Sequence, residues 1–249
     1  MRIMSRLFFV ISIVSLVACG GGGGGNDSVS DSEVSPEGLY VGTTSNDSDF
    51  FGVILNNGEY YFLYSSSFYQ DEIGGVFLGD LTTDGNSFSS TNGIDLSIDY
   101  YEIYSADVSG NFTEKVSISG SASYSNEVVS FSGTYDPDYE KTPSLSAVSG
   151  NYLGEVATSY GVEGADLSIS SSGIISGESD NGCTASGTID PRSSGNVYDV
   201  TLSFQGGSCV FGTQTFSGIA YYLDDVSGIY AIAPNSSRDD GVLFVGQKY

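Results

Sequence analysis

The chain has 249 residues, carries a formal net charge of −24 at pH 7 and contains neither histidine nor tryptophan. An acidic surface of this kind repels nucleic acids and anionic lipid head groups, which argues against a nucleic-acid partner. The absence of histidine excludes a Ser-His-Asp triad and an imidazole-bound zinc, and it removes the commonest general base near neutral pH. We therefore expect a protein that is not an enzyme, with no catalytic residues, no metal site and no cofactor.

The first predicted element is an apolar run of 12 residues, Leu7 to Ala18, that follows a basic start. It is shorter than the roughly 20 residues that a helix needs to cross the hydrocarbon layer. A basic start, a short apolar run and small residues before a break point are typical of a secretory signal. The tetrad Leu16-Val-Ala-Cys19 resembles the bacterial lipobox. That resemblance implies a signal peptide over residues 1–18 and attachment of lipid, palmitate included, to Cys19.

Residues 19–37 are predicted to be the lipidated cysteine and a flexible tether. Six glycines follow Cys19, and the remainder is rich in Ser and Asp, a composition that leaves a chain flexible. In Gram-negative lipoproteins an aspartate after the lipidated cysteine tends to retain the protein in the inner membrane, so Gly20 favours the outer membrane by the same resemblance. We therefore expect a lipid-anchored protein of the outer membrane, on its periplasmic face or at the cell surface.

From Gly38 onward the chain shows short runs in which apolar and polar residues alternate, separated by Gly, Asn, Asp and Ser. Clear examples are residues 128–135, 197–204 and 215–222. Turn signals such as Asn56-Asn-Gly58 stand between such runs and recur every 10 to 15 residues, as expected for hairpins. The pattern predicts an all-β fold of antiparallel up-and-down strands, in which neighbours in sequence pair in space.

A weak internal repeat divides these strands into two lobes. The opening Gly38-Leu-Tyr-Val-Gly42 is echoed by Gly150-Asn-Tyr-Leu-Gly154, and each begins a set of about eight strands, which is what a small closed barrel needs. We predict an N-terminal β lobe over residues 38–149 and a C-terminal β lobe over residues 150–249, both barrel-like. One larger barrel or a two-sheet sandwich also fits the strand count. Residues 136–143, which carry two of the five prolines, are expected to cross over before the last strand of the N-terminal lobe.

The order of these parts resembles one class of bacterial surface protein. A lipidated tether followed by glycine-rich β-barrel lobes is similar to the transferrin-binding-protein-type surface lipoproteins of Gram-negative bacteria. The Gly-x-Tyr-x-Gly openings also resemble the first strand of lipocalin-like barrels. The resemblance spans residues 38–249 and implies eight-stranded barrel lobes, and it carries over no receptor-contact residue.

Besides Cys19 the chain has two cysteines, Cys183 and Cys209. An even pair in an oxidising compartment predicts one disulfide, which closes a loop of 27 residues. The chain-entropy formula gives such a bond about 3.5 kcal/mol of stabilisation. Free thiols or a two-cysteine metal site are the alternatives, and no third type of ligand clusters nearby.

Acidic clusters offer another kind of chemistry. Residues 46–49, 136–140, 224–225 and 239–240 carry oxygens suited to Ca²⁺, but none has the spacing of an EF-hand loop. Asp and Asn favour turns for their backbone geometry alone. Every acidic residue is expected on a solvated loop, so no pair of carboxylates is assigned to hydrolysis of a glycosidic bond.

Aromatic residues crowd both faces of several predicted strands, at positions where alternation would expect a polar residue. Exposed tyrosine is favoured in binding surfaces because it presents a large rigid area with a polar tip. The alternative is that the interior and exterior of a barrel both need bulk. The predicted candidate binding surface consists of Tyr60, Tyr61, Tyr64, Phe68, Tyr69, Tyr100, Tyr101 and Tyr104.

These observations predict a non-catalytic binding or interaction module for an unknown protein or small-molecule ligand. Ligand capture would use a barrel mouth or the tyrosine-rich strand surface. The alternative is a structural or assembly role at the envelope, without a small-molecule ligand. A ligand-sized pocket in either lobe favours the first function, and fully packed interiors favour the second.

Overall fold

The computed structural model describes residues 34–249, so the predicted signal peptide, Cys19 and most of the predicted tether lie outside the described residues. Of the described residues, 62% are in strands and 4% in helices. Two short helices, η2 (Pro137–Glu140) and α1 (Leu145–Val148), separate two sets of strands, and no described helix is long and apolar enough to span a membrane. The strands are β1 (Gly38–Thr44), β2 (Asp49–Ile54), β3 (Glu59–Ser65), β4 (Ile73–Asp80), β5 (Thr82–Asp84), β6 (Ser87–Ser97), β7 (Glu102–Thr113), β8 (Ser117–Ser123), β9 (Val128–Asp136), β10 (Gly150–Thr158), β11 (Gly161–Ile169), β12 (Ile174–Ser179), β13 (Thr184–Pro191), β14 (Tyr198–Phe204), β15 (Thr215–Leu223), β16 (Gly228–Pro234) and β17 (Gly241–Lys248).

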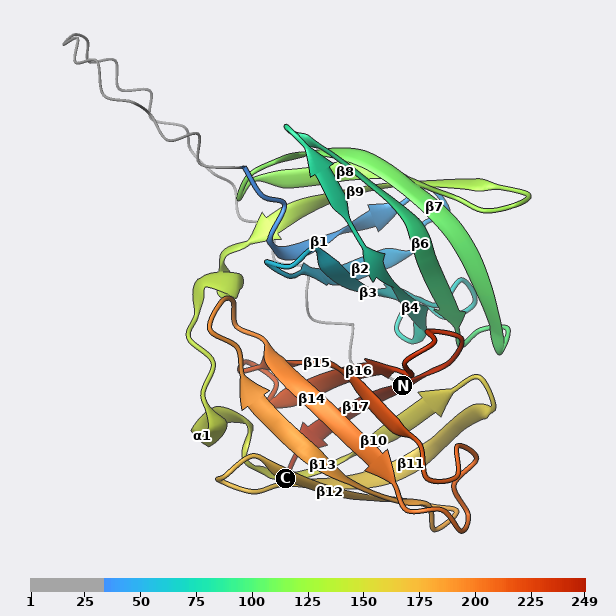
Figure 1. Ribbon diagram of the computed structural model, residues 1–249, viewed down its shortest axis with the longest axis vertical. Coiled ribbons are helices and arrows are strands. Elements are labelled where there is room, and N and C mark those ends of the chain that lie inside the picture. The colour runs from blue at the N-terminus through green and yellow to red at the C-terminus, as the bar shows by residue number, and fades with distance from the viewer. Residues whose placement is uncertain (1–33) are drawn as a thin grey trace, which may run out of the picture.

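The strands form two closed antiparallel barrels of eight strands each (Figure 1). In the N-terminal barrel β1 to β4 are followed by β6 to β9, and the ring closes where β1 pairs with β9 and β4 pairs with β6. The short β5 is an additional strand that pairs with β6. In the C-terminal barrel β10 to β17 follow in order, and β10 pairs with β17. The predicted all-β, up-and-down fold with two barrel lobes is confirmed.

The alternation that predicts the strands also decides which side chains enter a barrel. In β14, Tyr198, Val200 and Phe204 are buried, whereas Asp199 and Thr201 are exposed. Successive side chains of a strand point to opposite faces, so one apolar set lines the interior while its neighbours face solvent. This arrangement places the core of each lobe along the axis of its barrel.

The segment between the barrels differs from the prediction. Residues 136–143 contain η2 and lead into α1, so the expected last strand of the N-terminal lobe after residue 143 is wrong, and β9 is that last strand. Ser144 caps α1 because its hydroxyl accepts from the backbone N–H of Ala147 at 3.3 Å. Leu145 and Val148 then pack into the core of the C-terminal barrel. Because of the Ser144 cap and these two apolar side chains, the segment forms a short helix that fills one end of the C-terminal barrel instead of a strand.

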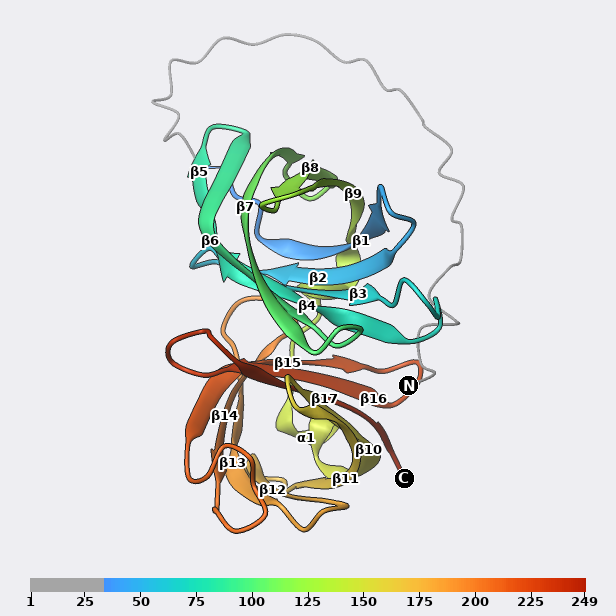
Figure 2. The same ribbon diagram turned by 90° about the vertical axis from the view of Figure 1, so that its right-hand side faces the viewer.

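The two barrels pack against each other through their outer faces. Strands β2 to β4 lie over strands β15 to β17 (Figure 2), and one apolar cluster runs across the contact. The ring of Phe51 has its centroid 5.0 Å from that of Tyr221 and 5.9 Å from that of Tyr230. Beside this cluster the Arg238 guanidinium donates to both carboxylate oxygens of Asp80. The outward faces of these strands are therefore buried by the other barrel.

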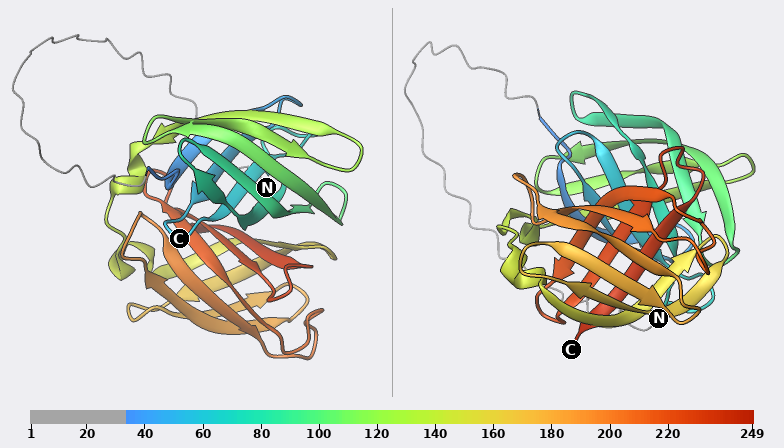
Figure 3. Two further views of the ribbon diagram at one scale, coloured as in Figure 1. Left: turned by 45° about the horizontal axis from the view of Figure 1, so that its top comes forward. Right: turned by 60° about the horizontal axis from the view of Figure 1, so that its bottom comes forward.

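One end of the N-terminal barrel lies near the two short helices, and the other end is formed by turns between strands. Helices η2 and α1 lie on one side of the molecule, and the turn between β8 and β9 extends on the opposite side (Figure 3). In an up-and-down barrel alternate connections gather at the same end. The turns after β1, β3, β6 and β8 therefore form one end of the N-terminal barrel, away from the two helices.

Candidate ligand cavity

The N-terminal barrel encloses a cavity of about 550 Å³, called the N-terminal cavity below. Its mouth lies at the end of the barrel formed by the turns after β1, β3, β6 and β8. One residue from each of these turns lines the mouth: Asn46, Ser67, Tyr100 and Asn126. The volume falls within the range of roughly 300–1,000 Å³ that small-molecule sites occupy.

Aromatic rings form the apolar wall of the N-terminal cavity. The ring centroid of Phe50 lies 5.5 Å from that of Phe62 and 6.2 Å from that of Phe131, both in edge-to-face geometry. Glycine makes room for these rings, since a Cβ on Gly133 would lie 2.8 Å from Cζ of Phe50. The phenylalanines of the wall are Phe50, Phe62, Phe77, Phe88 and Phe131.

A buried carboxyl group, that of Asp95 in β6, stands on this mainly aromatic wall and is 7% exposed. The Tyr64 hydroxyl donates to its Oδ1 at 2.7 Å, and the Tyr124 hydroxyl donates to its Oδ2 at 2.9 Å. Burial raises the pKa of the Asp95 carboxyl, and the two tyrosine hydrogen bonds oppose that shift because they stabilise the charged form. Among residues 34–249, no Lys or Arg forms an ion pair with Asp95.

The structure brings most of the predicted aromatic set to this cavity. Tyr60 and Tyr64 of β3 line its wall, and Tyr100 and Tyr104 line its mouth. Phe68, from the turn after β3, packs its ring edge-to-face against Tyr100 with centroids 5.7 Å apart. These five residues surround one cavity, on its wall or at its rim.

The remaining three residues of the set are placed differently. Tyr69 and Tyr101 are 67% and 52% exposed and belong to turns at the mouth end of the barrel. Tyr61 is 5% exposed and lies in the apolar cluster between the barrels. An exposed surface that includes Tyr60, Tyr61 and Tyr64 is therefore a wrong expectation. The reason is that β3 faces the cavity on one side and the C-terminal barrel on the other.

Sequence reasoning missed Asp95 and its partner Tyr124. The expectation that every acidic residue lies on a solvated loop is wrong for Asp95, which belongs to β6 and points inward. Asp95 stands between Ile94 and Leu96, so strand alternation places it on the face opposite to theirs and, read alone, indicates solvent. Ile94 and Leu96 pack instead against the apolar cluster between the barrels, which leaves Asp95 on the cavity side of β6.

The interior of the C-terminal barrel is filled instead. At one end α1 inserts, and Val148 is fully buried while its carbonyl accepts from the Tyr152 hydroxyl at 2.6 Å. At the other end the connection between β14 and β15, residues 205–214, places Phe211 inside. The ring centroid of Phe211 lies 4.8 Å from that of Phe216. The cavity beside Phe211 measures about 80 Å³, too small for a ligand of ordinary size.

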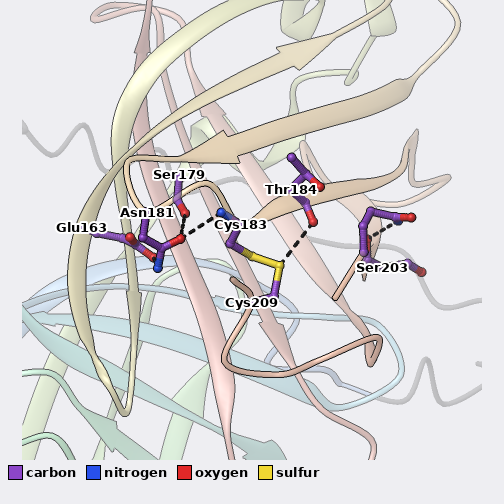
Figure 4. Close-up of a disulfide and its surroundings, with 8 residues drawn as sticks. Glu163, Ser179, Asn181, Cys183, Thr184, Ser203 and Cys209 are labelled. Carbon is purple, nitrogen blue, oxygen red and sulfur yellow. Dashed lines mark hydrogen bonds between the residues drawn. A yellow bond between two sulfur atoms is a disulfide. The ribbon is translucent and has the colours of Figure 1, made fainter. Parts of the chain in front are cut away.

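The predicted disulfide between Cys183 and Cys209 holds this connection in place (Figure 4). Cys209 lies within residues 205–214, and Cys183 directly precedes β13, so the bond ties the connection to the barrel wall. Asn181 supports the bond because its side-chain oxygen accepts from the Cys183 N–H at 2.8 Å. No group of three His, Cys, Asp or Glu side chains suited to a metal ion occurs among residues 34–249.

Fold and site together define a protein of two antiparallel β-barrels, one holding a ligand-sized cavity. No protein-family model matches the chain, and no curated protein matches it in sequence. One similar solved structure is a candidate outer membrane protein of Bacteroides fragilis NCTC 9343, with 13% identity, a TM-score of 0.25, and coverage of 85% of this chain and 96% of that chain.

Two further similar structures are transferrin binding proteins B. That of Neisseria meningitidis serogroup B has 13% identity and a TM-score of 0.29, with 82% of this chain and 53% of that chain covered. That of Haemophilus parasuis Hp5, a double mutant, has 12% identity and a TM-score of 0.29, with 81% of this chain and 54% of that chain covered. This chain thus spans about half the length of both.

The transferrin-binding-protein-type lipoproteins that the sequence resembles are thus among the solved structures similar to this chain. At these identities and TM-scores the likeness carries no conclusion about the site of this chain. The chemistry of the N-terminal cavity therefore has to be inferred from the residues of this chain.

Proposed function

We propose that this protein is a non-catalytic binding module of the outer membrane, anchored by lipid at Cys19, whose N-terminal barrel takes up a small ligand. The observation that carries the proposal is the cavity of about 550 Å³ that opens at one end of this barrel. A structural role at the envelope without a ligand would need no cavity, and both barrels would then be expected to have packed interiors. The packed C-terminal barrel fits such a supporting role within the same molecule.

The position of the predicted tether supports this function. Strand β1 begins at Gly38, at the end of the barrel opposite the mouth, and ends at Thr44, which lines the mouth. The Tyr40 hydroxyl donates to the Pro36 carbonyl at 2.9 Å, which fixes the incoming chain at that end. The last residues of the predicted tether, 19–37, are thus held on the barrel, so the mouth faces away from the point where the tether joins the barrel and is open to ligands from the surrounding solution.

A cavity-filling substitution tests ligand uptake. Ala122 of β8 lines the N-terminal cavity, and its neighbour Ser123 is exposed on the outside of the same strand. Nile red, a neutral dye that fluoresces in apolar surroundings, is titrated into the full chain and two variants. We expect Ala122→Trp to weaken dye binding by tenfold or more and Ser123→Trp to leave it unchanged. Equal dye binding by wild type and Ala122→Trp, or none by wild type, contradicts the proposal.

The anchor is tested separately. Cys19→Ala removes the atom to which lipid is attached under the proposal, while the described residues 34–249 stay unaltered. Two or three acyl chains hold a protein on a membrane, whereas one gives only reversible attachment. Fractionation of cells that express the variant should find it in the soluble fraction, without incorporated palmitate. Retention of Cys19→Ala in the outer membrane would argue against this anchor.

A further inference from the structure

The charges around the N-terminal cavity are of one sign. Three carboxyl groups line it, those of Asp95, Asp99 and Glu127, and its lining among the described residues includes neither Lys nor Arg. Asp95 lies deepest, on β6, while Asp99 and Glu127 belong to turns at the mouth. An anionic ligand entering this cavity would meet like charges in a medium that screens them poorly. The cavity therefore selects against anions.

Asp95 keeps capacity for a further hydrogen bond. A carboxylate offers about four lone-pair sites on its two oxygens. Each oxygen accepts one hydrogen bond inside the protein, from Tyr64 on Oδ1 and from Tyr124 on Oδ2. The two hydroxyls hold the carboxylate in one orientation on the cavity wall. A ligand that carries N–H donors therefore meets an acceptor that is already in position.

The rest of the lining suits the body of such a ligand. Besides the five phenylalanines of the wall, the rings of Tyr60, Tyr64, Tyr100, Tyr104 and Tyr124 line the cavity. The face of an aromatic ring carries negative charge density and attracts a cation. A cation removed from water is tolerated in a protein when an opposite charge and further polar contacts replace its hydration. The N-terminal cavity offers both a buried carboxylate and aromatic faces.

We propose that the ligand of the N-terminal cavity is an organic cation, a primary or secondary ammonium group on an apolar or aromatic body, with Asp95 as its counter-ion. The ammonium group donates to the carboxylate of Asp95, and the apolar body occupies the space among the phenylalanine rings. This inference rests on the proposed function, because it names the class of ligand that the same cavity takes up.

Three probes that share one body and differ in charge test the inference: 4-phenylbutylamine, 4-phenylbutanol and 4-phenylbutyrate. Each is titrated calorimetrically into the full chain at about pH 8, where the amine, like a lysine side chain, stays protonated. We expect the amine to bind at least tenfold more tightly than the alcohol and the carboxylate to bind most weakly. Equal affinities, or the reverse order, overturn the inference while leaving ligand uptake intact. No binding of any probe overturns the proposed function itself.

Two variants assign the preference to one residue. In Asp95→Asn the amine should fall to the affinity of the alcohol, while the affinity of the alcohol itself stays within about twofold and so reports an intact cavity. Asp107→Asn removes the same charge from the exposed face of β7 and should keep the full preference. A preference for the amine that survives in Asp95→Asn contradicts the role of this residue.

Salt separates the buried pair from attraction by the acidic surface. At about 0.5 M sodium chloride the interactions of exposed charges are largely screened, whereas a buried pair is screened much less. The preference for the amine over the alcohol should therefore persist at this salt concentration. Its disappearance would assign the preference to the overall negative charge rather than to Asp95.

Discussion

Each of the two barrels consists of eight up-and-down strands, but their interiors differ: one holds a cavity and the other is packed. Counted from the first strand of each barrel, the connection after β6 corresponds to the connection after β14. The first has four residues, 98–101, and the second has ten, 205–214. The longer connection reaches over its barrel and places Phe211 inside, whereas the shorter one leaves the N-terminal cavity open.

The comparison shows that strand number does not decide whether such a barrel holds a ligand. An eight-stranded barrel has an interior just wide enough to be filled by side chains or to hold one small molecule. In the C-terminal barrel α1 enters one end and the disulfide-bonded connection covers the other. In the N-terminal barrel the space is kept by rings along the wall and by glycines that let those rings approach the backbone. The segments that cover the barrel ends and the packing along the wall together decide between a filled and an open interior.

Removal of the Phe211 ring from the interior of the C-terminal barrel should lower stability more than the other changes considered below. Phe211 is 7% exposed and contacts Phe204 and Phe216. Phe211→Ala should lower the free energy of unfolding by about 4 kcal/mol, since it leaves a cavity where a large ring was packed. Denaturant unfolding measures the loss. Val210→Ala is the control, because Val210 is 55% exposed and its substitution should cost little.

The same variant also tests whether Phe211 closes the C-terminal barrel to ligands. Once Phe211 is gone, the mouth of the C-terminal barrel resembles that of the N-terminal barrel, and Nile red should find a second site per chain. A stability loss below about 1 kcal/mol, with a single dye site, would show that Phe211 does not close this barrel.

The next effect comes from the disulfide. Replacing Cys183 and Cys209 together by alanine should cost about 3.5 kcal/mol in the chain-entropy model, for a sequence separation of 26 residues. Because the bond lies in the C-terminal barrel, dye affinity of the N-terminal cavity should stay unchanged. Thermal or denaturant unfolding measures the cost, and chemical reduction of the wild type provides the control. A loss of dye binding on reduction would contradict the separation of roles.

A smaller and pH-dependent effect is expected for Asp95→Asn. The folded-state pKa of Asp95 lies above the ordinary aspartate value of 3.8, since burial, with Asp99 and Glu127 nearby, outweighs the hydrogen bonds from Tyr64 and Tyr124. The Asp95 carboxylate therefore binds a proton more tightly in the folded protein than in the unfolded chain. The stability of the protein falls as pH rises from 3.8 through the folded pKa. Asparagine does not titrate. The free energy of unfolding of the variant should therefore rise relative to that of the wild type as the pH rises from 3.8 through the folded pKa of Asp95.

Unfolding by guanidinium at a series of pH values measures this difference. The expected result is a stability difference between variant and wild type that grows with pH and then levels off above the folded pKa of Asp95. Parallel stability curves for the two proteins would show that the carboxyl is not buried as described.

The smallest effect on stability is expected at the rim. Tyr100 is 57% exposed and contacts Phe68, so Tyr100→Ala should change the free energy of unfolding by no more than about 0.5 kcal/mol. Since Tyr100 lines the mouth, 4-phenylbutylamine should nevertheless bind severalfold more weakly. Calorimetry and denaturant unfolding measure the two effects on one sample. An unchanged affinity for the amine would remove Tyr100 from the site.

Much of the fold could be predicted because its signals are local. The alternation of residues 128–135 and 215–222 and the turn at Gly58 each depend on a few neighbouring residues. These signals give the strands β9 and β15 and the pairing of neighbours, and the repeated openings at Gly38 and Gly150 give the two barrels.

The site was harder to predict because it depends on which face of a strand meets which partner. Tyr60 and Tyr61 are neighbours with similar chemistry, yet one lines the cavity and the other packs against the second barrel. The sequence shows that both faces of β3 are aromatic, and it does not show what covers each face. Asp95 was missed for a related reason, since acids in this chain are common at turns and its position within a strand was overlooked.

Under this proposal the N-terminal barrel, and not the C-terminal one, holds the ligand. A crystal structure of the full chain grown with 4-phenylbutylamine would locate the ligand. We expect one molecule of the amine within the N-terminal cavity, with its nitrogen within hydrogen-bond distance of the Asp95 carboxylate. Density for the amine inside the C-terminal barrel, or an N-terminal barrel collapsed around its own side chains, would contradict it.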